Sequence, residues 1–254
     1  MISFKNLHYN DEPLLLGNVW NVQSAGVYEK SGYQALATSS SAVAHSLGYE
    51  DGEQMTFEEY FYIIKRIKES TSIPLSVDLE AGYGNTTELI VSNIFRLLEI
   101  GVSGINLEDT YLIDGVRKLL DREVFFKKIK DIISQLGESR DEVFINIRTD
   151  PFLLGIENAL EETLERIKLF EELKVDGVFV PGMTSVDDIK TVVDATFLPV
   201  NVMCLPELPD FNTLKKLGVK RITSGAFLNR YIYKELEKTI GNISDQQSFV
   251  SLFT

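Results

Sequence analysis

Three apolar runs in the middle of the chain end in ionisable side chains. Asp78 and Glu80 close the first run, Glu108 follows the second, and Arg148 ends the third. Asp78 and Glu80 are two residues apart, so an extended backbone would turn both the same way. Carboxylates gathered without compensation repel one another and lose hydration. The pattern therefore predicts a bound divalent cation; the alternative is a network of Arg148 and carboxylates that only stabilises the fold.

The type of metal follows from which other ligands are present. The two histidines, His8 and His45, are too few for a His-rich zinc site, so carboxylates must hold any metal. Carboxylate oxygens favour a hard cation such as Mg²⁺. The single cysteine, Cys204, cannot form an internal disulfide, which fits a reducing cytoplasm. We expect Cys204 to be a buried structural thiol on its strand.

A run of hydroxyl side chains, Thr38 to Ser41, follows another apolar segment. Hydroxyls and free backbone N–H groups at a strand end suit a carboxylate or an oxyanion. Ser39, Ser40 and Ser41 are therefore candidates for substrate binding. A helix N-cap would explain one of these serines but not all three.

Eight short apolar runs alternate with amphipathic stretches along the whole chain, as expected for parallel strands covered on both faces. The predicted strands are Leu14–Val19, Ala35–Ser39, Leu75–Leu79, Gly104–Leu107, Val143–Arg148, Gly177–Val180, Val200–Met203 and Arg221–Thr223. Helical patterns include Thr56–Ser70, Thr86–Ile100, Asp121–Gln135, Glu157–Leu173, Asp210–Leu217 and Phe227–Thr239. We predict a single (β/α)8 TIM barrel over residues 1–254, since the G-x-G-x-x-G turn that would favour a doubly wound sheet does not occur.

The tail over 241–254 contains Phe249, Leu252 and Phe253. These apolar residues are expected either to contact another subunit or to pack on their own barrel.

Charge and hydropathy exclude several classes of partner. The 254 residues include 25 Lys and Arg against 38 Asp and Glu, a formal charge of −13, which would repel nucleic acids and anionic membranes. A small anionic substrate responds to local charge and is not excluded. No apolar run approaches the roughly 20 residues that span a bilayer, and Met1–Asp11 lacks a signal-peptide core, so we expect a cytoplasmic protein.

Taken together, the motifs resemble the isocitrate lyase/phosphoenolpyruvate mutase superfamily, and they extend over most of the chain. The segments that carry the resemblance are Asn18–Trp20, Thr38–Asp51, Asp78–Gly84, Gly104–Asp109, Asn146–Asp150 and Phe179–Gly182. Members of the superfamily form an enolate of pyruvate or a similar acid. They are commonly homotetramers that exchange their last helix, which would give the apolar tail a role.

The resemblance also implies individual roles. Asp78, Glu80 and Glu108 would hold Mg²⁺ or Mn²⁺, partly through water, and Arg148 would neutralise an oxyanion or the transferred group. Asp51 matches the aspartate that mutases place near the transferred phosphoryl group.

The same resemblance assigns substrate contacts. Ser39–Ser41 would hold the carboxylate and carbonyl of the substrate. Asn201 begins the segment that corresponds to the Asn-x-Thr-Glu-Phe strand of the lyases and is a further substrate-binding candidate.

Departures from the family pattern narrow the reaction. The stretch Asp109–Lys118 contains neither the Lys-Lys/Arg-Cys-Gly-His loop of the lyases nor the Lys-rich gating loop of the mutases, and it reads as a short loop. A cysteine-dependent isocitrate lyase is therefore not expected.

Three hypotheses follow. The first is a mutase-like enzyme that cleaves or rearranges the C–P or C–C bond of a small 2-oxo acid or phosphonate. The second is a C–C lyase, decarboxylase or hydrolase acting on oxaloacetate or a substituted malate. The third is a barrel that binds a dicarboxylate without catalysis.

Overall fold

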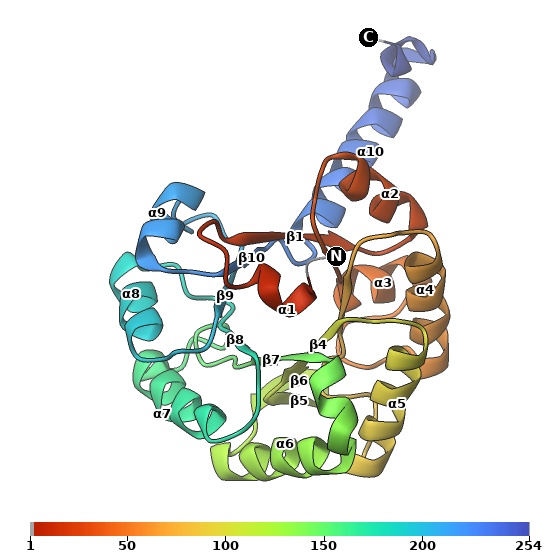
Figure 1. Ribbon diagram of the computed structural model, residues 1–254. Coiled ribbons are helices and arrows are strands. Elements are labelled where there is room, and N and C mark those ends of the chain that lie inside the picture. The colour runs from red at the N-terminus through yellow and green to blue at the C-terminus, as the bar shows by residue number, and fades with distance from the viewer. Residues whose placement is uncertain (1–2, 254) are drawn as a thin grey trace.

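Eight parallel strands form a closed barrel in the computed structural model, which describes residues 3–253 (Figure 1). Around the barrel the strands follow the order β1-β10-β9-β8-β7-β4-β3-β2. Their bounds are β1 Leu14–Val19, β2 Leu36–Thr38, β3 Leu75–Asp78, β4 Gly104–Glu108, β7 Phe144–Arg148, β8 Gly177–Phe179, β9 Val200–Met203 and β10 Arg221–Thr223. The predicted TIM barrel is thus confirmed, and each predicted strand lies within two residues of an observed one.

Helices cover the outside of the barrel, and most of them begin at side-chain caps. At α4, for example, Thr56 and Glu59 form a reciprocal capping box that satisfies two otherwise free N–H groups. The helices are α1 Phe4–Leu7, α2 Val22–Lys30, α3 Ser40–Leu47, α4 Phe57–Glu69, α5 Thr87–Glu99, α6 Arg122–Leu136, α7 Ala159–Glu171, α8 Val186–Asp194, α9 Phe211–Leu217 and α10 Phe227–Gln246, with 3-10 turns at Gly137–Glu142 and Val250–Leu252. None of these helices has the length and apolarity that a membrane crossing requires.

The short helix α1 lies over one opening of the barrel (Figure 1). Phe4 and Leu7 pack there with Leu14 and Phe144 in a cluster separate from the main core. A Cβ atom at Gly104 would approach the Phe4 ring to 2.6 Å, so glycine at the start of β4 allows the closure. Any site for a ligand must therefore lie at the opposite opening.

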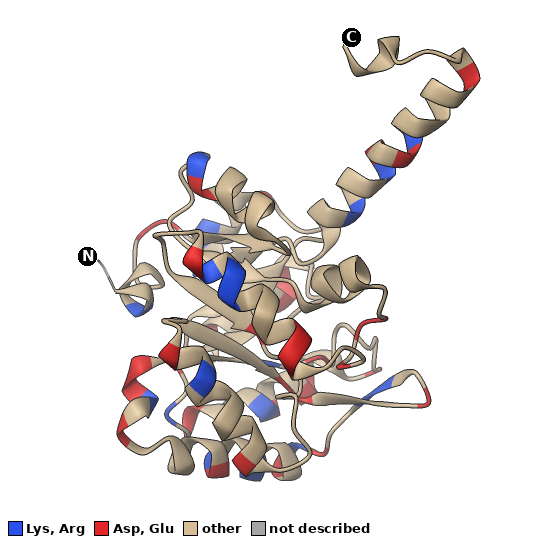
Figure 2. Cartoon of the chain, turned by 90° about the vertical axis from the view of Figure 1, so that its right-hand side faces the viewer, with Lys and Arg blue, Asp and Glu red and all other residues tan. Residues whose placement is uncertain are grey.

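Two segments extend from that opposite side (Figure 2). The stretch predicted as a short loop is a β-hairpin of β5 (Thr110–Ile113) and β6 (Val116–Leu119). Asp114 and Gly115 form its two-residue turn, both with positive φ, as favoured in tight hairpins.

The last helix also differs from the prediction. It continues past 239 to Gln246 and projects away from the barrel (Figures 1 and 2). Phe249 and Phe253 beyond it are 67% and 86% exposed, so the hypothesis that this tail packs on its own barrel is wrong.

Candidate active site

A cavity of about 280 Å³ occupies the barrel mouth, where the C-terminal ends of the strands meet. Six of the nine predicted site residues line it: Ser39, Ser40, Ser41, Asp51, Asp78 and Arg148. The residues of the cavity wall come from widely separated parts of the chain, brought together by the closure of the barrel.

The serine run joins the cavity to Asp78. Ser39 caps α3 by accepting a hydrogen bond from the N–H of Ala42 at 3.3 Å. Ser40 donates its hydroxyl hydrogen to Asp78 Oδ2 at 2.8 Å, and the buried Ser41 Oγ has no hydrogen-bond partner among the residues that the structure describes. One serine therefore has the cap role, while the other two remain directed to the site chemistry.

Arg148 is held rigidly at the end of β7. Its Nε and Nη2 donate to Asp150 Oδ1 and Oδ2 at 2.7 and 2.8 Å, and Asp150 is fully buried. The remaining nitrogen, Nη1, lies 2.9 Å from Glu108 Oε2. The bidentate contact with Asp150 fixes the plane of the guanidinium group, which lines the cavity.

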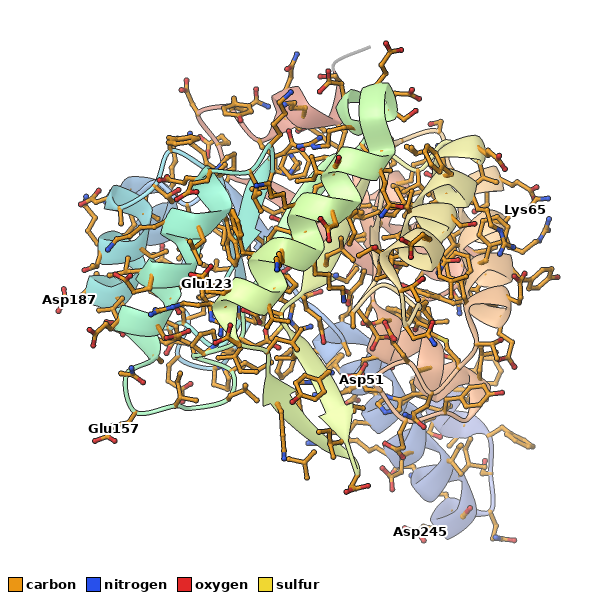
Figure 3. All side chains as sticks on the ribbon, turned by 90° about the horizontal axis from the view of Figure 1, so that it is seen from below. Asp51, Lys65, Glu123, Glu157, Asp187 and Asp245 are labelled. Carbon is orange, nitrogen blue, oxygen red and sulfur yellow. The ribbon has the colours of Figure 1, made fainter. Side chains whose placement is uncertain are left out.

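Glu108 is paired a second time, with an arginine that the sequence reasoning missed. Arg117 reaches in from β6, contacts Glu108 Oε1, and donates to Thr110 Oγ1 at 2.9 Å. Its other terminal nitrogen lies 3.3 Å from Asp51 Oδ2, and Asp51 lies beside the hairpin in Figure 3. The Asp114-Gly115 turn was the available signal, because such a pair between two short apolar runs predicts a hairpin.

Glu80 is not among the residues that line the cavity, and the strand geometry on which its predicted direction depended does not extend to it. Strand β3 ends at Asp78, and Glu80 has a left-handed backbone with φ of 48°, so the two-residue alternation does not reach it. Its carboxylate accepts hydrogen bonds from the Tyr83 hydroxyl at 2.6 Å and the Glu53 N–H at 3.0 Å.

Asn201 also lies away from the cavity wall. Its amide is fully buried inside the barrel, where Nδ2 donates to the carbonyl of Val202 at 2.8 Å and Oδ1 faces Asn146 Nδ2 at 3.4 Å. The structure therefore places this predicted substrate contact in the polar interior of the barrel.

The pKa values of the buried acids Asp78 and Glu80 are raised. Burial raises the pKa of Asp78, while the Arg148 guanidinium lowers it. Burial raises the pKa of Glu80 well above its ordinary value, and the charges of Asp51 and Glu108 raise it further. Although Glu80 does not line the cavity, it therefore lies close enough to these acids to feel their negative charge.

A hard cation fits part of this donor set. Asp78 Oδ1 is buried and accepts no hydrogen bond from any of residues 3–253, so within that part of the chain it is an available ligand oxygen. Glu80 and Glu108 are already bound by protein donors, and across residues 3–253 no three acidic, His or Cys side chains are arranged as a metal-binding group. The chemistry of the acids suits Mg²⁺, with Asp78 as the residue that would touch it.

The cavity wall, over the residues that the structure describes, contains neither cysteine nor histidine. Cys204 follows the end of β9 and is exposed, so the expectation of a buried thiol on a strand is wrong. His8 lies by the closed end of the barrel, stacked on Phe144. Nucleophilic catalysis by these side chains therefore does not fit the geometry.

Comparisons with known proteins give a family model and several relatives. Residues 4–244 match the family model described as phosphoenolpyruvate phosphomutase. An uncharacterised Mycobacterium tuberculosis protein is 30% identical over 225 residues, 89% of this chain and 82% of its own length. An oxaloacetate decarboxylase of Bradyrhizobium sp. is 26% identical over 241 residues, 91% of this chain and 82% of its own.

A crystal structure from Burkholderia cenocepacia, provisionally called a phosphonomutase, superposes with a TM-score of 0.87. It is 36% identical and covers 94% of this chain and 97% of its own. Family, fold and sequence similarity therefore converge on one group of proteins.

Proposed function

Because the chain belongs to the phosphoenolpyruvate phosphomutase family of enzymes, within the isocitrate lyase/phosphoenolpyruvate mutase superfamily, we propose that it is a Mg²⁺-dependent enzyme acting on a small 2-oxo acid. It breaks or rearranges the C–C or C–P bond next to the carbonyl group. The observation that carries the proposal is one cavity shared by Asp78, Ser40 and Arg148, which combines acids, hydroxyls and a fixed cation.

The chemistry requires a place for an electron pair. When the bond breaks heterolytically, its electrons remain on the pyruvyl carbon and spread to the carbonyl oxygen, which gives an enolate. A cation bound at Asp78 would supply positive charge to that oxygen. Ser40 and Ser41 offer hydroxyl groups on the same wall, and such preorganised dipoles favour the transition state over the ground state.

Arg148 serves the opposite end of the substrate. The departing group begins as a carboxylate or a phosphonate and leaves as CO₂ or as a transferred phosphoryl group. A guanidinium held in place by Asp150 can bind that anionic group before the bond breaks. Both substrate types generate the same pyruvate enolate, so one cavity suits either.

The role of Asp51 would differ between the two reactions, phosphoryl transfer and decarboxylation. A phosphoryl transfer would use its carboxylate as acceptor, base or water-positioning group, whereas decarboxylation requires no acceptor. The second candidate function is a C–C lyase or decarboxylase acting on oxaloacetate. It is supported by the oxaloacetate decarboxylases among the relatives.

The test is incubation of the protein with phosphonopyruvate and, separately, oxaloacetate, with Mg²⁺ and with excess chelator. We expect pyruvate or phosphoenolpyruvate to form from at least one substrate, detected by proton and phosphorus NMR, and to disappear with chelator. If neither acid is consumed above the uncatalysed rate, the proposed reaction is wrong.

A barrel that binds a dicarboxylate without catalysis is the remaining alternative, and two substitutions separate it. Arg148→Ala and Asp78→Ala should abolish turnover while the circular dichroism spectrum stays native. A protein that only binds would show no turnover to lose, with or without these changes.

We further propose that the protein forms a homo-oligomer, with a tetramer favoured, through its C-terminal arm, residues 241–254 together with the preceding part of α10. Tyr231, Leu236 and Ile240 on α10 are each about half exposed or more, which is unusual for a helix that packs only on its own chain.

A further inference from the structure

Arg221 starts β10 and points into the barrel, where it lines the floor of the cavity. It is 1% exposed. Its Nη2 lies 3.3 Å from Asn106 Oδ1 on β4, so the side chain reaches across the barrel. Nε and Nη1 are buried and have no hydrogen-bond partner in the part of the chain that the structure describes.

The other deeply buried arginines are bound differently. Arg140 donates to the carbonyls of Lys174 and Val143 and pairs with Asp176. Arg166 pairs with Asp109 and Glu162. Both have their charge balanced within the protein, as is usual for a guanidinium removed from water.

Arg221 has no such direct balance among residues 3–253. Asp78 is near enough for its charge to raise the pKa of Arg221, but burial dominates and lowers that pKa to about 9. The group therefore stays protonated at neutral pH. A buried cation that lines a cavity, with two N–H groups that have no partner among the described residues, is a candidate binding position for an anion.

The neighbouring strands indicate which anion. In the barrel, β10 adjoins β1, which adjoins β2, and these strands contribute Thr223, Asn18 and Thr38 to the same cavity wall. Arg148 comes from β7, on the far side of the barrel from β1.

Resting on the function proposed above, we propose that Arg221 binds the carboxylate that the 2-oxo acid retains, at the floor of the cavity and between β10 and β2. The bond to be broken then points across the cavity to Arg148. Two guanidinium groups on separate walls would select small substrates with two acidic groups, one retained and one removed. Arg221 is thus a substrate-binding residue that sets specificity.

The test compares Arg221→Met with a matched control, Arg140→Met. Both variants remove a buried guanidinium and keep a similar apolar volume, but Arg140 is fully bonded and outside the cavity. The probes are Mg²⁺ alone and oxalate in the presence of Mg²⁺, because oxalate has the size and planarity of an enolate of pyruvate. Dissociation constants come from titration calorimetry and melting temperatures from circular dichroism.

We expect Arg221→Met to weaken oxalate binding at least about tenfold, the loss of one hydrogen bond to a charged group. Its melting temperature without ligand should equal or exceed that of the wild type, because an unbalanced buried charge is gone. Affinity for Mg²⁺ should be retained. Arg140→Met should melt lower and bind oxalate within about twofold of wild type.

Several results would overturn the inference. Arg221→Met could bind oxalate as the wild type does, or lose Mg²⁺ and oxalate in equal proportion, which would make Arg221 a support for Asp78. If Arg221→Met does not fold, the inference is contradicted, because the guanidinium group would then stabilise the fold. Arg221→Lys keeps a positive charge, and it would still show whether oxalate affinity is lost. If wild type itself binds no oxalate, the proposed function fails instead.

Discussion

Asp150→Asn tests whether the rigid placement of Arg148 matters to the reaction. Asp150 is fully buried and accepts two hydrogen bonds from Arg148, on Nε and Nη2, at 2.7 and 2.8 Å. Asparagine has nearly the same shape but only one acceptor oxygen. Its amide group would face one of the two guanidinium N–H groups, so Arg148 would lose one charge-assisted bond and its fixed plane.

The size of the effect follows from that single bond. A hydrogen bond to a charged group contributes about 1.5–3 kcal/mol. If this loss falls on the transition state, kcat/KM decreases roughly 10- to 150-fold, since about 1.4 kcal/mol corresponds to a factor of ten. We expect most of the decrease in kcat, because Arg148 acts on charge that is redistributed as the bond breaks.

The assay measures pyruvate release from oxaloacetate at saturating Mg²⁺, coupled to reduction by lactate dehydrogenase, with phosphonopyruvate as the second substrate. The control is Asp176→Asn, which weakens another buried aspartate–arginine pair, with Arg140. It should lower the melting temperature without changing the kcat of the folded fraction. Wild-type kcat/KM in Asp150→Asn, or an equal loss in both variants, would refute the positioning role.

Three further predictions concern other parts of the molecule. His8 is buried, and burial is the main reason that its pKa is lowered to about 3. As the pH falls below 6.5, the unfolded chain therefore binds a proton at His8 before the folded chain does. The free energy of unfolding is unaffected at neutral pH and decreases toward acid, by about 2 kcal/mol at pH 5. In urea denaturation at pH 7 and pH 5, His8→Phe should lose that part of the pH dependence, and an unchanged difference would contradict the reasoning. Arg117→Met should bind Mg²⁺ more tightly by calorimetry, on the order of fivefold, because a competing cation beside Glu108 is removed, whereas Lys118→Met, an exposed cation on the same hairpin, should not. Deleting residues 241–254 should reduce the mass found by sedimentation equilibrium, and the same mass in both proteins would show that the arm holds no interface.

The barrel was predictable because its strands are buried on both faces. A strand such as Leu36–Thr38, buried at every position, has to be apolar or uncharged throughout, and this makes it visible in the sequence. The helix ends were visible for a similar local reason, since caps such as Thr56 with Glu59 lie next to the turn that they satisfy. The end of α10 was not: the predicted helix ends at Thr239, whereas the observed helix continues to Gln246.

The site was predictable where a side chain belongs to the strand itself. Asp78 and Arg148 are the last residues of β3 and β7, so the strand direction carries them to the mouth. Glu80 lies two residues past the strand, and its direction depends on a left-handed turn that the alternation rule does not contain. Arg117 depends on how the hairpin folds back over the barrel, a contact between distant parts of the chain.

The proposed function gives two kinds of positive charge, a metal cation and arginine, separate places in the site. Glu108 lies between two guanidinium groups, one fixed by Asp150 and one brought by the hairpin, so arginine can balance it. Asp78 accepts a hydroxyl hydrogen on one oxygen, and its other oxygen has no partner within residues 3–253, so a bound metal cation could share that oxygen with a ligand. A metal cation suits the enolate oxygen, because it can bind that oxygen and a protein carboxylate at the same time. A guanidinium group suits the departing carboxylate or phosphonate, because it can donate two parallel hydrogen bonds. The division of charge between the Asp78 wall and the Arg148 wall is thus the arrangement expected of a site that separates a 2-oxo acid into an enolate and an acidic leaving group.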